Sequence, residues 1–245
     1  MAVIAIGDIH GNLRALDDLL GKISQEIDSG DTVVFLGDYI DRGPDSKGCI
    51  QRILDFRRTT QVQVVSLLGN HEQWMLQTCH DYSRHSWLLG MEAFPTIQSY
   101  APDAGSRLLD EIGIFGQRFI YEQVQLPYEL FFDAIPPDHI EFLSSLKSFF
   151  RSAEGIYVHA GVNPAGGKVE EQAVDRLIWG VEEFPDFYVG NENVVYGHWN
   201  NPVFDAKGWP HPRIVGRTYG MDTIANGVLS AIRMPDAAVF QSGRY

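Results

Sequence analysis

Five short polar motifs, each placed directly after a short apolar run, constrain the fold of this chain more than any other feature of its sequence. A run rich in β-branched residues that ends in glycine and a polar side chain is typical of a buried strand that stops and turns at the edge of a sheet. Five such strands can bring their polar side chains to one edge. Two cations held there about 3.5–4 Å apart would form a site of the kind that hydrolyses phosphate esters. The runs and the motifs that follow them are Val3–Ile6 before Gly7-Asp8-Ile9-His10-Gly11, Thr32–Leu36 before Gly37-Asp38-Tyr39-Ile40-Asp41-Arg42-Gly43, Val62–Leu68 before Gly69-Asn70-His71-Glu72, Gly155–Val158 before His159-Ala160-Gly161, and Val194–Tyr196 before Gly197-His198.

The residue types in the motifs match the ligands of a mixed nitrogen and oxygen metal site. Asp8 and His10 are two positions apart, so on an extended segment their side chains point to the same side. Asp38 supplies a carboxylate that can bridge two cations. Without sulfur, such a set suits Mn²⁺, Fe or Zn²⁺ better than a calcium cage or a thiolate-bound structural zinc. The other candidate ligands are the amide oxygen of Asn70 and the imidazoles of His159 and His198.

Any one of these residues, taken alone, has a simpler interpretation. An Asp after a strand is usually a cap or turn residue, and a buried His is usually a satisfied core side chain. Five motifs in order, each at a strand end and next to glycine, are not explained in this way, so the sequence predicts a two-metal site. We expect the histidines outside the motifs on the surface or in an insertion; they are His80, His85, His139 and His211.

Composition excludes several other classes of protein. The net charge is 19 − 32 = −13, which disfavours attraction to nucleic acid or to anionic membranes as a whole. The two cysteines, Cys49 and Cys79, form no disulfide framework and indicate a reducing compartment. No basic leader and no apolar run of about 20 residues is present, so we expect a cytoplasmic protein.

The order of the predicted elements is that of an α/β domain. Up to the third motif, strands alternate with a helix capped by Asn12 and ending near Ser29-Gly30 and a second helix over 46–57, which implies a parallel sheet. Residues 73–150 are rich in aromatic side chains and predict a mostly helical insertion with aromatic packing between its helices. One helix is expected over 136–146, where it starts at its prolines. We interpret residues 1–245 as a single domain whose last third returns to strands, expected over 155–158, 194–196, 214–215, 228–234 and 239–241.

Together the motifs GDIHG, GDYIDRG, GNHE, HAG and GH resemble the signature of the calcineurin-like metallophosphoesterase superfamily. Within it they are most similar to the phosphoprotein phosphatase branch of serine/threonine phosphatases and symmetrical dinucleoside tetraphosphatases. Residues 87–100, 135–143 and 221–233 also resemble bacterial protein phosphatases, so the likeness covers nearly the whole chain. The resemblance implies an α/β fold in which a β-sheet sandwich is flanked by helices and carries a mostly helical insertion.

The resemblance also implies a role for each motif residue. Asp8, His10 and Asp38 would bind one divalent metal ion, with Asp38 bridging to a second. His71 would be the general acid, oriented by Asp41, and a hydroxide bridging the metals would attack phosphorus directly. Mn²⁺ is the first expectation, with Fe and Zn²⁺ as alternatives. The second metal would be held by Asp38, Asn70, His159 and His198, and the phosphoryl oxygens by Arg42 and Asn70.

Two positions depart from the family pattern. Val181 stands where a second phosphate-binding arginine is usual, in the stretch that begins at Trp179. A tryptophan, Trp199, follows the histidine of the fifth motif where threonine is more common. With Trp209 and Tyr219 it could form an aromatic lip over the site, or it could serve packing alone. Arginines that could substitute for the missing one are Arg176, Arg213 and Arg217.

Three functions remain open from the sequence. The first is a serine/threonine protein phosphatase that acts on a phosphorylated protein or a small phosphoester, without nucleic acid or membrane as partner. The second is a symmetrical bis(5'-nucleosyl)-tetraphosphatase or another nucleotide phosphohydrolase, which would need a base-stacking surface and more cationic groups. The third is an inactive metal-binding scaffold, which the complete set of ligands and the presence of His71 disfavour.

Overall fold

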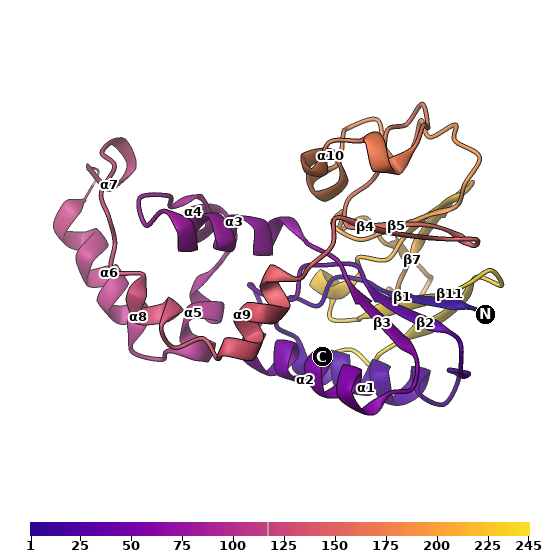
Figure 1. The fold of residues 1–245 in the computed structure, drawn as a ribbon, viewed down its shortest axis with the longest axis horizontal. Helices are drawn as coiled ribbons and strands as arrows, with labels where there is room; N and C mark the ends of the chain where they lie inside the picture. Colours follow the sequence, from indigo (N-terminus) through magenta and orange to yellow (C-terminus); the bar gives the residue numbers. More distant parts are fainter. Residues whose placement is uncertain (117) are drawn as a thin grey trace.

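The computed structural model describes residues 1–116 and 118–245, apart from the side chain of residue 120. Two five-stranded sheets face each other, with helices on their outer sides and a helical region extending from one end (Figure 1). No helix among the described residues is both long and apolar enough to cross a membrane.

The first sheet contains the strands that precede the first three motifs. β1, β2 and β3 are parallel, with Val3 opposite Thr32 and Thr32 opposite Gln63, whereas β11 runs antiparallel to β1 and β12 antiparallel to β11. The carboxyl ends of the three parallel strands therefore meet at one edge. In spatial order the strands are β12 (Ala238–Gln241), β11 (Ser230–Met234), β1 (Val3–Ile6), β2 (Thr32–Phe35) and β3 (Gln63–Ser66).

The second sheet contains the strands that precede the last two motifs. β5, β6 and β10 are parallel, and the antiparallel strands β4 and β9 form its edges. Its spatial order is β4 (Phe149–Ser152), β5 (Gly155–Val158), β6 (Val194–Tyr196), β10 (Thr218–Gly220) and β9 (Arg213–Val215). A separate hairpin joins β7 (Val203–Phe204) to β8 (Pro210–His211).

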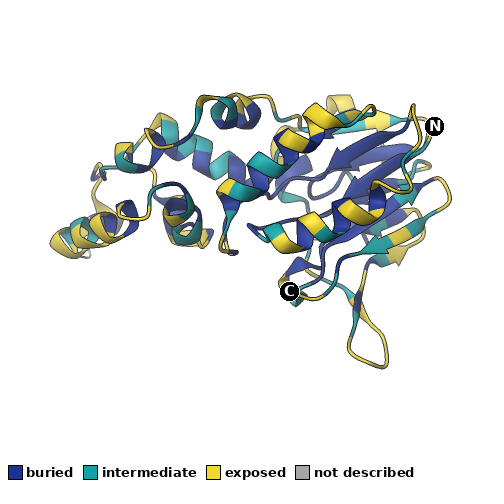
Figure 2. Ribbon diagram, turned by 90° about the horizontal axis from the view of Figure 1, so that it is seen from below, coloured by how far each residue is buried: buried dark blue, intermediate teal, exposed yellow. Residues whose placement is uncertain are grey.

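Because successive side chains point to opposite faces of each strand, the apolar side chains form three layers. On β1, Ile4 and Ile6 face the helices while Val3 and Ala5 face the second sheet. On β5, Tyr157 points between the sheets and its two neighbours point outward. The central strands β1, β2, β5 and β6 are buried throughout, whereas β3, β4, β9 and β12 are partly exposed; Figure 2 shows the buried strands in the middle of the fold. The first sheet is covered by α1 (Leu13–Ile23) and α2 (Ser46–Thr59), and the second by α10 (Val174–Trp179) and a 3₁₀ turn over Val169–Glu171; a second 3₁₀ turn spans Ile224–Asn226.

The helical insertion is confirmed, and its aromatic side chains pack between its helices. The ring of Trp87 lies 5.4 Å from that of Phe131, and Tyr100 contacts the same phenylalanine edge-on at 5.8 Å. His139, which we expected at the surface or in the insertion, is fully buried there. The helices are α3 (Asn70–His80), α4 (Ser86–Gly90), α5 (Phe94–Tyr100), α6 (Ala104–Phe115), α7 (Arg118–Tyr121), α8 (Glu129–Phe132) and α9 (Pro137–Ser144).

Several details of the sequence prediction were wrong. The five motif strands do not share one sheet edge, because they are divided three and two between the sheets. Asn12 occupies the N-cap position of α1, but its side chain makes no capping hydrogen bond, because its amide donates to the carbonyl oxygens of Ile9 and His10. The helix ends at Ile23 rather than near Ser29-Gly30. Phe149 and Phe150 belong to β4, not to the insertion.

Candidate metal centre

The five motifs converge where the carboxyl ends of the two sets of parallel strands meet. Asp8 and His10 follow β1, Asp38 follows β2, and the third motif starts α3 directly after the loop that leaves β3. His159 follows β5 and His198 follows β6. Since β1, β2 and β3 point the same way, as do β5 and β6, the loops after them can surround one point.

Asp38 lies at the centre of the cluster. One carboxylate oxygen, Oδ2, lies 3.6 Å from His10 Nε2, and the other, Oδ1, lies 3.4 Å from His159 Nε2. Asn70 Oδ1 lies 3.0 Å from His159 Nε2 and 3.2 Å from His198 Nδ1. The carboxylate of Asp38 therefore faces two groups of potential ligands, one on each side.

Backbone carbonyls fix which nitrogen of each imidazole faces the cluster. His10 Nδ1 lies 2.9 Å from the carbonyl oxygen of Ile40, and His159 Nδ1 lies 3.0 Å from that of Leu36. Because a carbonyl oxygen only accepts, both Nδ1 atoms carry a hydrogen. Their Nε2 atoms then face Asp38, which is how a protein orients histidines toward a metal.

The site residues adopt backbone conformations that side chains rarely allow. Five of the non-glycine residues with positive φ belong to the predicted site: His10 at 45°, Asp38 at 52°, Asp41 at 70°, Arg42 at 64° and His198 at 61°. Such conformations cost on the order of 1–3 kcal/mol each and persist only where the surroundings hold them. Holding these five residues in such conformations therefore lowers the stability of the fold, and contacts with the surrounding structure must compensate for it.

Glu72 supplies much of that support, although no separate role was predicted for it. Its carboxylate is fully buried and accepts hydrogen bonds from the backbone N–H groups of Asp38, Tyr39 and Ile40 at 2.8–3.2 Å. A further bond comes from the N–H of Gly69. Glu72 thereby holds the loop after β2 against the start of α3.

Unpaired carboxylate oxygens indicate that the cluster suits a cation. Asp8 accepts the backbone N–H of His198 through Oδ2, but its Oδ1 has no hydrogen-bond partner among the described residues. Asp222, after β10, is 2 % exposed, and neither of its oxygens has a partner within the same part of the chain. Buried carboxylates without partners are costly. The residues present therefore fit a pair of divalent metal ions.

The acid–base properties of His10, His198 and Asp8 agree with that interpretation, whereas His159 would have to release a proton to a bound ion: burial opposes its charge, but Asp38 outweighs this and raises the pKa of His159 to about 10. Burial lowers the pKa of His10 and the pKa of His198 to about 3, so both are neutral and can offer a lone pair. Burial also raises the pKa of Asp8 well above its usual value, and repulsion from Asp222 raises it further. A bound cation would remove that penalty. Burial opposes ionisation of Asp38 as well, but the nearby His159 holds the pKa of that carboxyl well below its usual range.

His71 and Asp41 form a separate pair at the edge of the cluster. His71 Nδ1 lies 2.7 Å from Asp41 Oδ2, and its other ring nitrogen lies 3.8 Å from Asp38 Oδ2. Burial opposes the charge on His71, but Asp38 and Asp41 outweigh it and raise the pKa of His71 above its usual value. The pair can therefore present a protonated imidazole to a group bound at the metals.

Two residues of the insertion contact this pair, and sequence reasoning missed both. Trp87 Nε1 donates to Asp41 Oδ2 at 2.9 Å, and Thr96 Oγ1 donates to Asp41 Oδ1 at 2.6 Å. They are 46 and 55 residues from Asp41 in the chain, so no local spacing could have indicated the contacts.

The candidate substitutes for the missing arginine differ in position. Arg213, at the start of the edge strand β9, pairs with Asp186, and Arg217 lies at the amino-terminal end of β10, away from the motifs. Arg176 lies on α10 and is partly exposed. Neither Arg213 nor Arg217 is placed to face the cluster.

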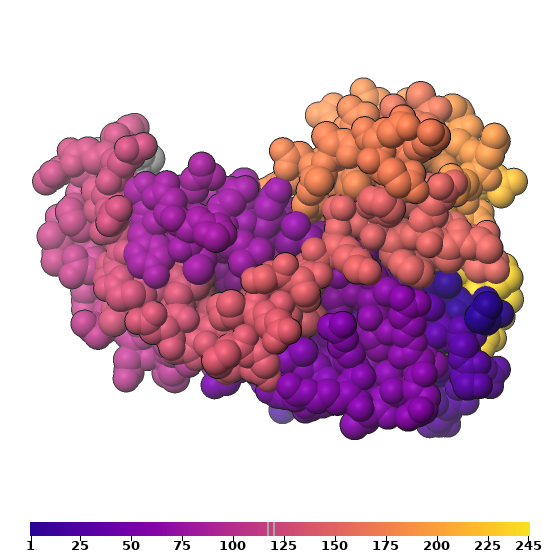
Figure 3. Space-filling view, in the orientation of Figure 1, coloured from indigo at the N-terminus to yellow at the C-terminus, as the bar shows by residue number. Residues whose placement is uncertain are grey.

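Of the two roles that the sequence left open for Trp209, packing is the one that the structure supports. Trp209 bonds to Gln241 and lies under Arg244, so it serves packing elsewhere. Instead, the rings of Trp179 and Trp199 flank His198, with centroids 6.4 and 4.8 Å from it. Trp74 packs on Trp179 at 4.6 Å, which joins α3 to α10. The molecular surface is indented between these two helices (Figure 3).

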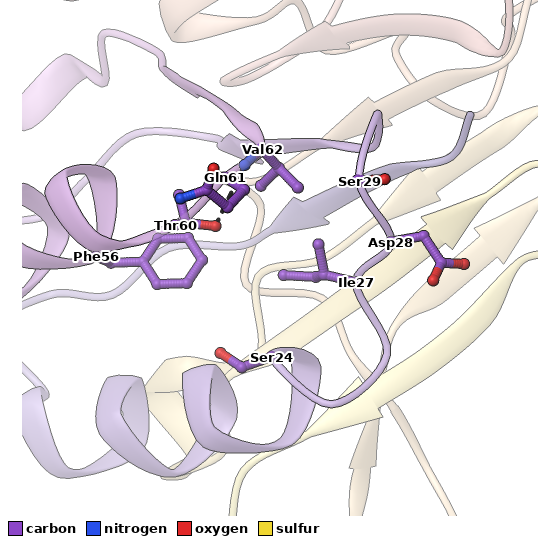
Figure 4. A pocket seen from close by; sticks show the side chains of 8 residues that line it. All are labelled: Ser24, Ile27, Asp28, Ser29, Phe56, Thr60, Gln61 and Val62. Carbon is purple, nitrogen blue, oxygen red and sulfur yellow. Dashed lines mark hydrogen bonds between the residues drawn. The ribbon is translucent and has the colours of Figure 1, made fainter.

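A surface depression of about 310 Å³ lies at the opposite end of the first sheet, beyond α1 and before β3. Figure 4 shows Ile27 pointing toward Phe56, and Asp28 pointing away from both. It brings together no group of metal-binding side chains, and it is separate from the motifs.

Comparison with known proteins agrees with the motifs. Residues 1–202 match the family described as calcineurin-like phosphoesterase. The zinc-dependent endopolyphosphatase of Saccharomyces cerevisiae is 28% identical over 146 residues, which cover 53% of this chain and 42% of that protein, so the chain spans less than half of its length. The asymmetrical bis(5'-nucleosyl)-tetraphosphatase PrpE of Bacillus subtilis is 26% identical over 259 residues, covering 96% of this chain and 92% of that protein.

Solved structures share the fold. A putative diadenosine tetraphosphatase aligns with a TM-score of 0.63 and 21% identity over 100% of this chain and 94% of its own. A protein serine/threonine phosphatase from Saccharomyces cerevisiae aligns with a TM-score of 0.52 and 13% identity, covering 100% of this chain and 80% of its own. At these identities the likeness shows the two-sheet architecture.

Proposed function

Because this chain belongs to the calcineurin-like phosphoesterase family and is a hydrolase of phosphoester bonds, we propose that it removes phosphoryl groups from phosphorylated proteins by direct attack of water. The observation that carries the proposal is the His71–Asp41 pair, held 2.7 Å apart beside the Asp38 carboxylate. It supplies an acid where a leaving oxygen would need a proton.

The residues of the cluster would hold two divalent metal ions. Asp8, His10 and Asp38 would hold one ion, and Asp38 would be shared with the other; His10 and Asp38 lie within reach of one shared ion, whereas Asp8 belongs to neither compact group of potential ligands among the described residues. When bound, such a pair acidifies a water near neutral pH and polarises phosphoryl oxygens. Mn²⁺, Fe and Zn²⁺ all suit this donor set. The second position would be held by Asp38, Asn70, His159 and His198.

The remaining steps belong to side chains of this chain. Arg42 is exposed at the rim of the cluster and carries a planar guanidinium that can bind two phosphoryl oxygens at once. The amide of Asn70 adds a neutral contact. His71 donates its proton to the departing oxygen, while Asp41 holds the imidazole in the orientation that this transfer requires. No side chain needs to form a covalent bond to phosphorus.

A second candidate substrate is a dinucleoside tetraphosphate. The relatives that this chain matches over nearly their whole length, such as the one from Bacillus subtilis, are named as tetraphosphatases. The tilted pair of Trp74 and Trp179 beside His198 would offer a surface for a nucleobase. The overall charge of −13 and the loss of an arginine at Val181 count against four phosphates.

A substrate panel tests both candidates. The purified protein, loaded in turn with Mn²⁺, Zn²⁺ and Fe²⁺, is assayed for phosphate release from phosphoserine and phosphothreonine peptides, para-nitrophenyl phosphate and diadenosine tetraphosphate, with His71→Asn as the matched control. Higher kcat/KM on the phosphopeptides supports the first proposal, and higher kcat/KM on the dinucleotide replaces it with the second. Inertness of a fully metal-loaded sample toward every compound would leave only a metal-binding scaffold.

A further inference from the structure

The segment of the insertion from Trp87 to Thr96 contacts the loop after β2, which carries Asp41 and Arg42, at several points. The indole N–H of Trp87 donates to Asp41 Oδ2, the oxygen that also faces His71. The hydroxyl of Thr96 donates to Asp41 Oδ1 and accepts the backbone N–H of Asp41 at 2.8 Å. The carbonyl oxygen of Glu92 accepts the backbone N–H of Arg42 at 3.3 Å.

These contacts hold a strained part of the loop. Asp41 and Arg42 are consecutive non-glycine residues with φ of 70° and 64°, a conformation that needs support from outside the loop. Asp41, Trp87 and Thr96 are all fully buried, so water does not compete for these hydrogen bonds. Charge-assisted bonds to a buried carboxylate are stronger than neutral ones and fix its direction.

We propose that Trp87 and Thr96 are positioning residues, which hold the carboxylate of Asp41 in the one orientation that aims His71 at the leaving oxygen. The insertion thereby becomes part of the catalytic apparatus rather than an appendage of the sandwich. The proposal rests on the proposed role of His71 as the acid. Neither residue touches substrate in this scheme, since each acts through Asp41.

The proposal predicts a selective loss of proton transfer. Trp87→Phe keeps an aromatic ring against Phe131 but removes the N–H, and Thr96→Val keeps the shape but removes the hydroxyl. We expect each variant to lose roughly tenfold in kcat on an alkyl phosphate, which needs protonation of its leaving oxygen. On para-nitrophenyl phosphate, kcat should change less than threefold. KM and the number of bound Mn²⁺ ions should not change, and Thr96→Ser should restore activity.

Two comparisons separate positioning from a general loss of packing. Tyr100→Phe is the matched control, because it removes one buried hydroxyl from the same insertion, 2.7 Å from His139 and without contact to Asp41. In the Asp41→Asn background, Trp87→Phe should cause no further loss, since residues that act through one group are not additive. Equal loss on alkyl and aryl phosphates, or full additivity with Asp41→Asn, would overturn the proposal.

A spectroscopic measurement keeps the test independent of turnover. In protein labelled with ¹⁵N-histidine, the Nδ1–H signal of His71 is assigned by its absence in His71→Asn. We expect that signal to shift in Trp87→Phe and Thr96→Val but not in Tyr100→Phe. If the signal shifts while the wild-type protein hydrolyses no phosphoester, the proposed function fails, but the effect of Trp87 and Thr96 on His71 through Asp41 is supported. If hydrolysis is found and the signal stays unchanged in both variants, the positioning role of Trp87 and Thr96 is overturned and the proposed function is not.

Discussion

Arg42 Nη1 lies 2.9 Å from His10 Nε2, the nitrogen that the carbonyl of Ile40 leaves as an acceptor. The same lone pair cannot accept from a guanidinium and bind a metal ion. Arg42 is exposed, so its side chain can move away from His10 without exposing buried residues to water. Metal binding and the position of Arg42 are therefore linked.

Arg42→Ala should bind Mn²⁺ more tightly than the wild-type protein while turning over more slowly. Removing the competing donor and a positive charge favours the cation by about 1 kcal/mol, which is roughly fivefold in affinity. Isothermal titration calorimetry measures the affinity, and Arg42→Lys, which keeps the charge, is the control. Weaker Mn²⁺ binding by Arg42→Ala would contradict this interpretation of the contact.

His71→Asn should keep its metals and lose activity selectively. The amide can still occupy the space beside Asp41 but carries no acidic proton. We expect a fall of roughly 10²–10⁴-fold on poor leaving groups and a smaller fall on para-nitrophenyl phosphate. Steady-state kinetics with both substrates, alongside metal analysis of the same sample, measure the two effects. Equal losses on both substrates would exclude His71 as the general acid.

Asp222→Asn should stabilise the metal-free protein and weaken metal binding. Burial, with repulsion from Asp38, raises the pKa of Asp222 to about 6, so its ionised form opposes folding at higher pH. The free energy of unfolding of the wild-type protein should equal that of the variant near pH 4 and fall below it as pH rises through 6. At pH 8 the variant should gain about 1–3 kcal/mol in the free energy of unfolding. Urea denaturation in the presence of a chelator tests this, and a less stable variant would contradict it.

His139 should make the stability of the insertion depend on pH. Its ring is fully buried between the hydroxyl of Tyr100 and the side chain of Gln51, and burial lowers the pKa of His139 below its usual value of 6.5. The folded state then binds fewer protons than the unfolded state. The stability that the neutral His139 ring contributes is therefore complete above pH 6.5 and is lost as pH falls. Denaturation midpoints at pH 5.5 and 7.5 should differ more for the wild-type protein than for His139→Asn. Identical differences would exclude His139 as the cause.

The sequence indicated which side chains lie together better than it indicated the framework around them. Motifs such as Gly37-Asp38 reveal themselves because the apolar run, the glycine and the ligand are adjacent in the chain. Residue types alone suggested a common site, and the structure places the motif side chains together. Strands β4 and β10 escaped detection because they are only four and three residues long, too short to show an alternation of apolar and polar side chains.

Contacts between distant segments were beyond prediction from one sequence. Nothing near Trp87 or Thr96 indicates a carboxylate partner, since apolar surroundings also suit a tryptophan that serves packing alone. The division of the motif strands between two sheets was likewise hidden. A parallel strand such as Gly155–Val158 has the same buried pattern in either sheet. Its neighbour is decided by the fold as a whole.

The origin of the cluster in two sheets gives a bound cation a second effect. Asp38 and Asn70 come from loops of one sheet, and His159 and His198 from loops of the other. An ion shared by these four residues is a cross-link that shuts one end of the sandwich. Separation of the layers at that end then requires dissociation of the ion, so amide hydrogen exchange in β2 and β6 should slow as the metal concentration rises.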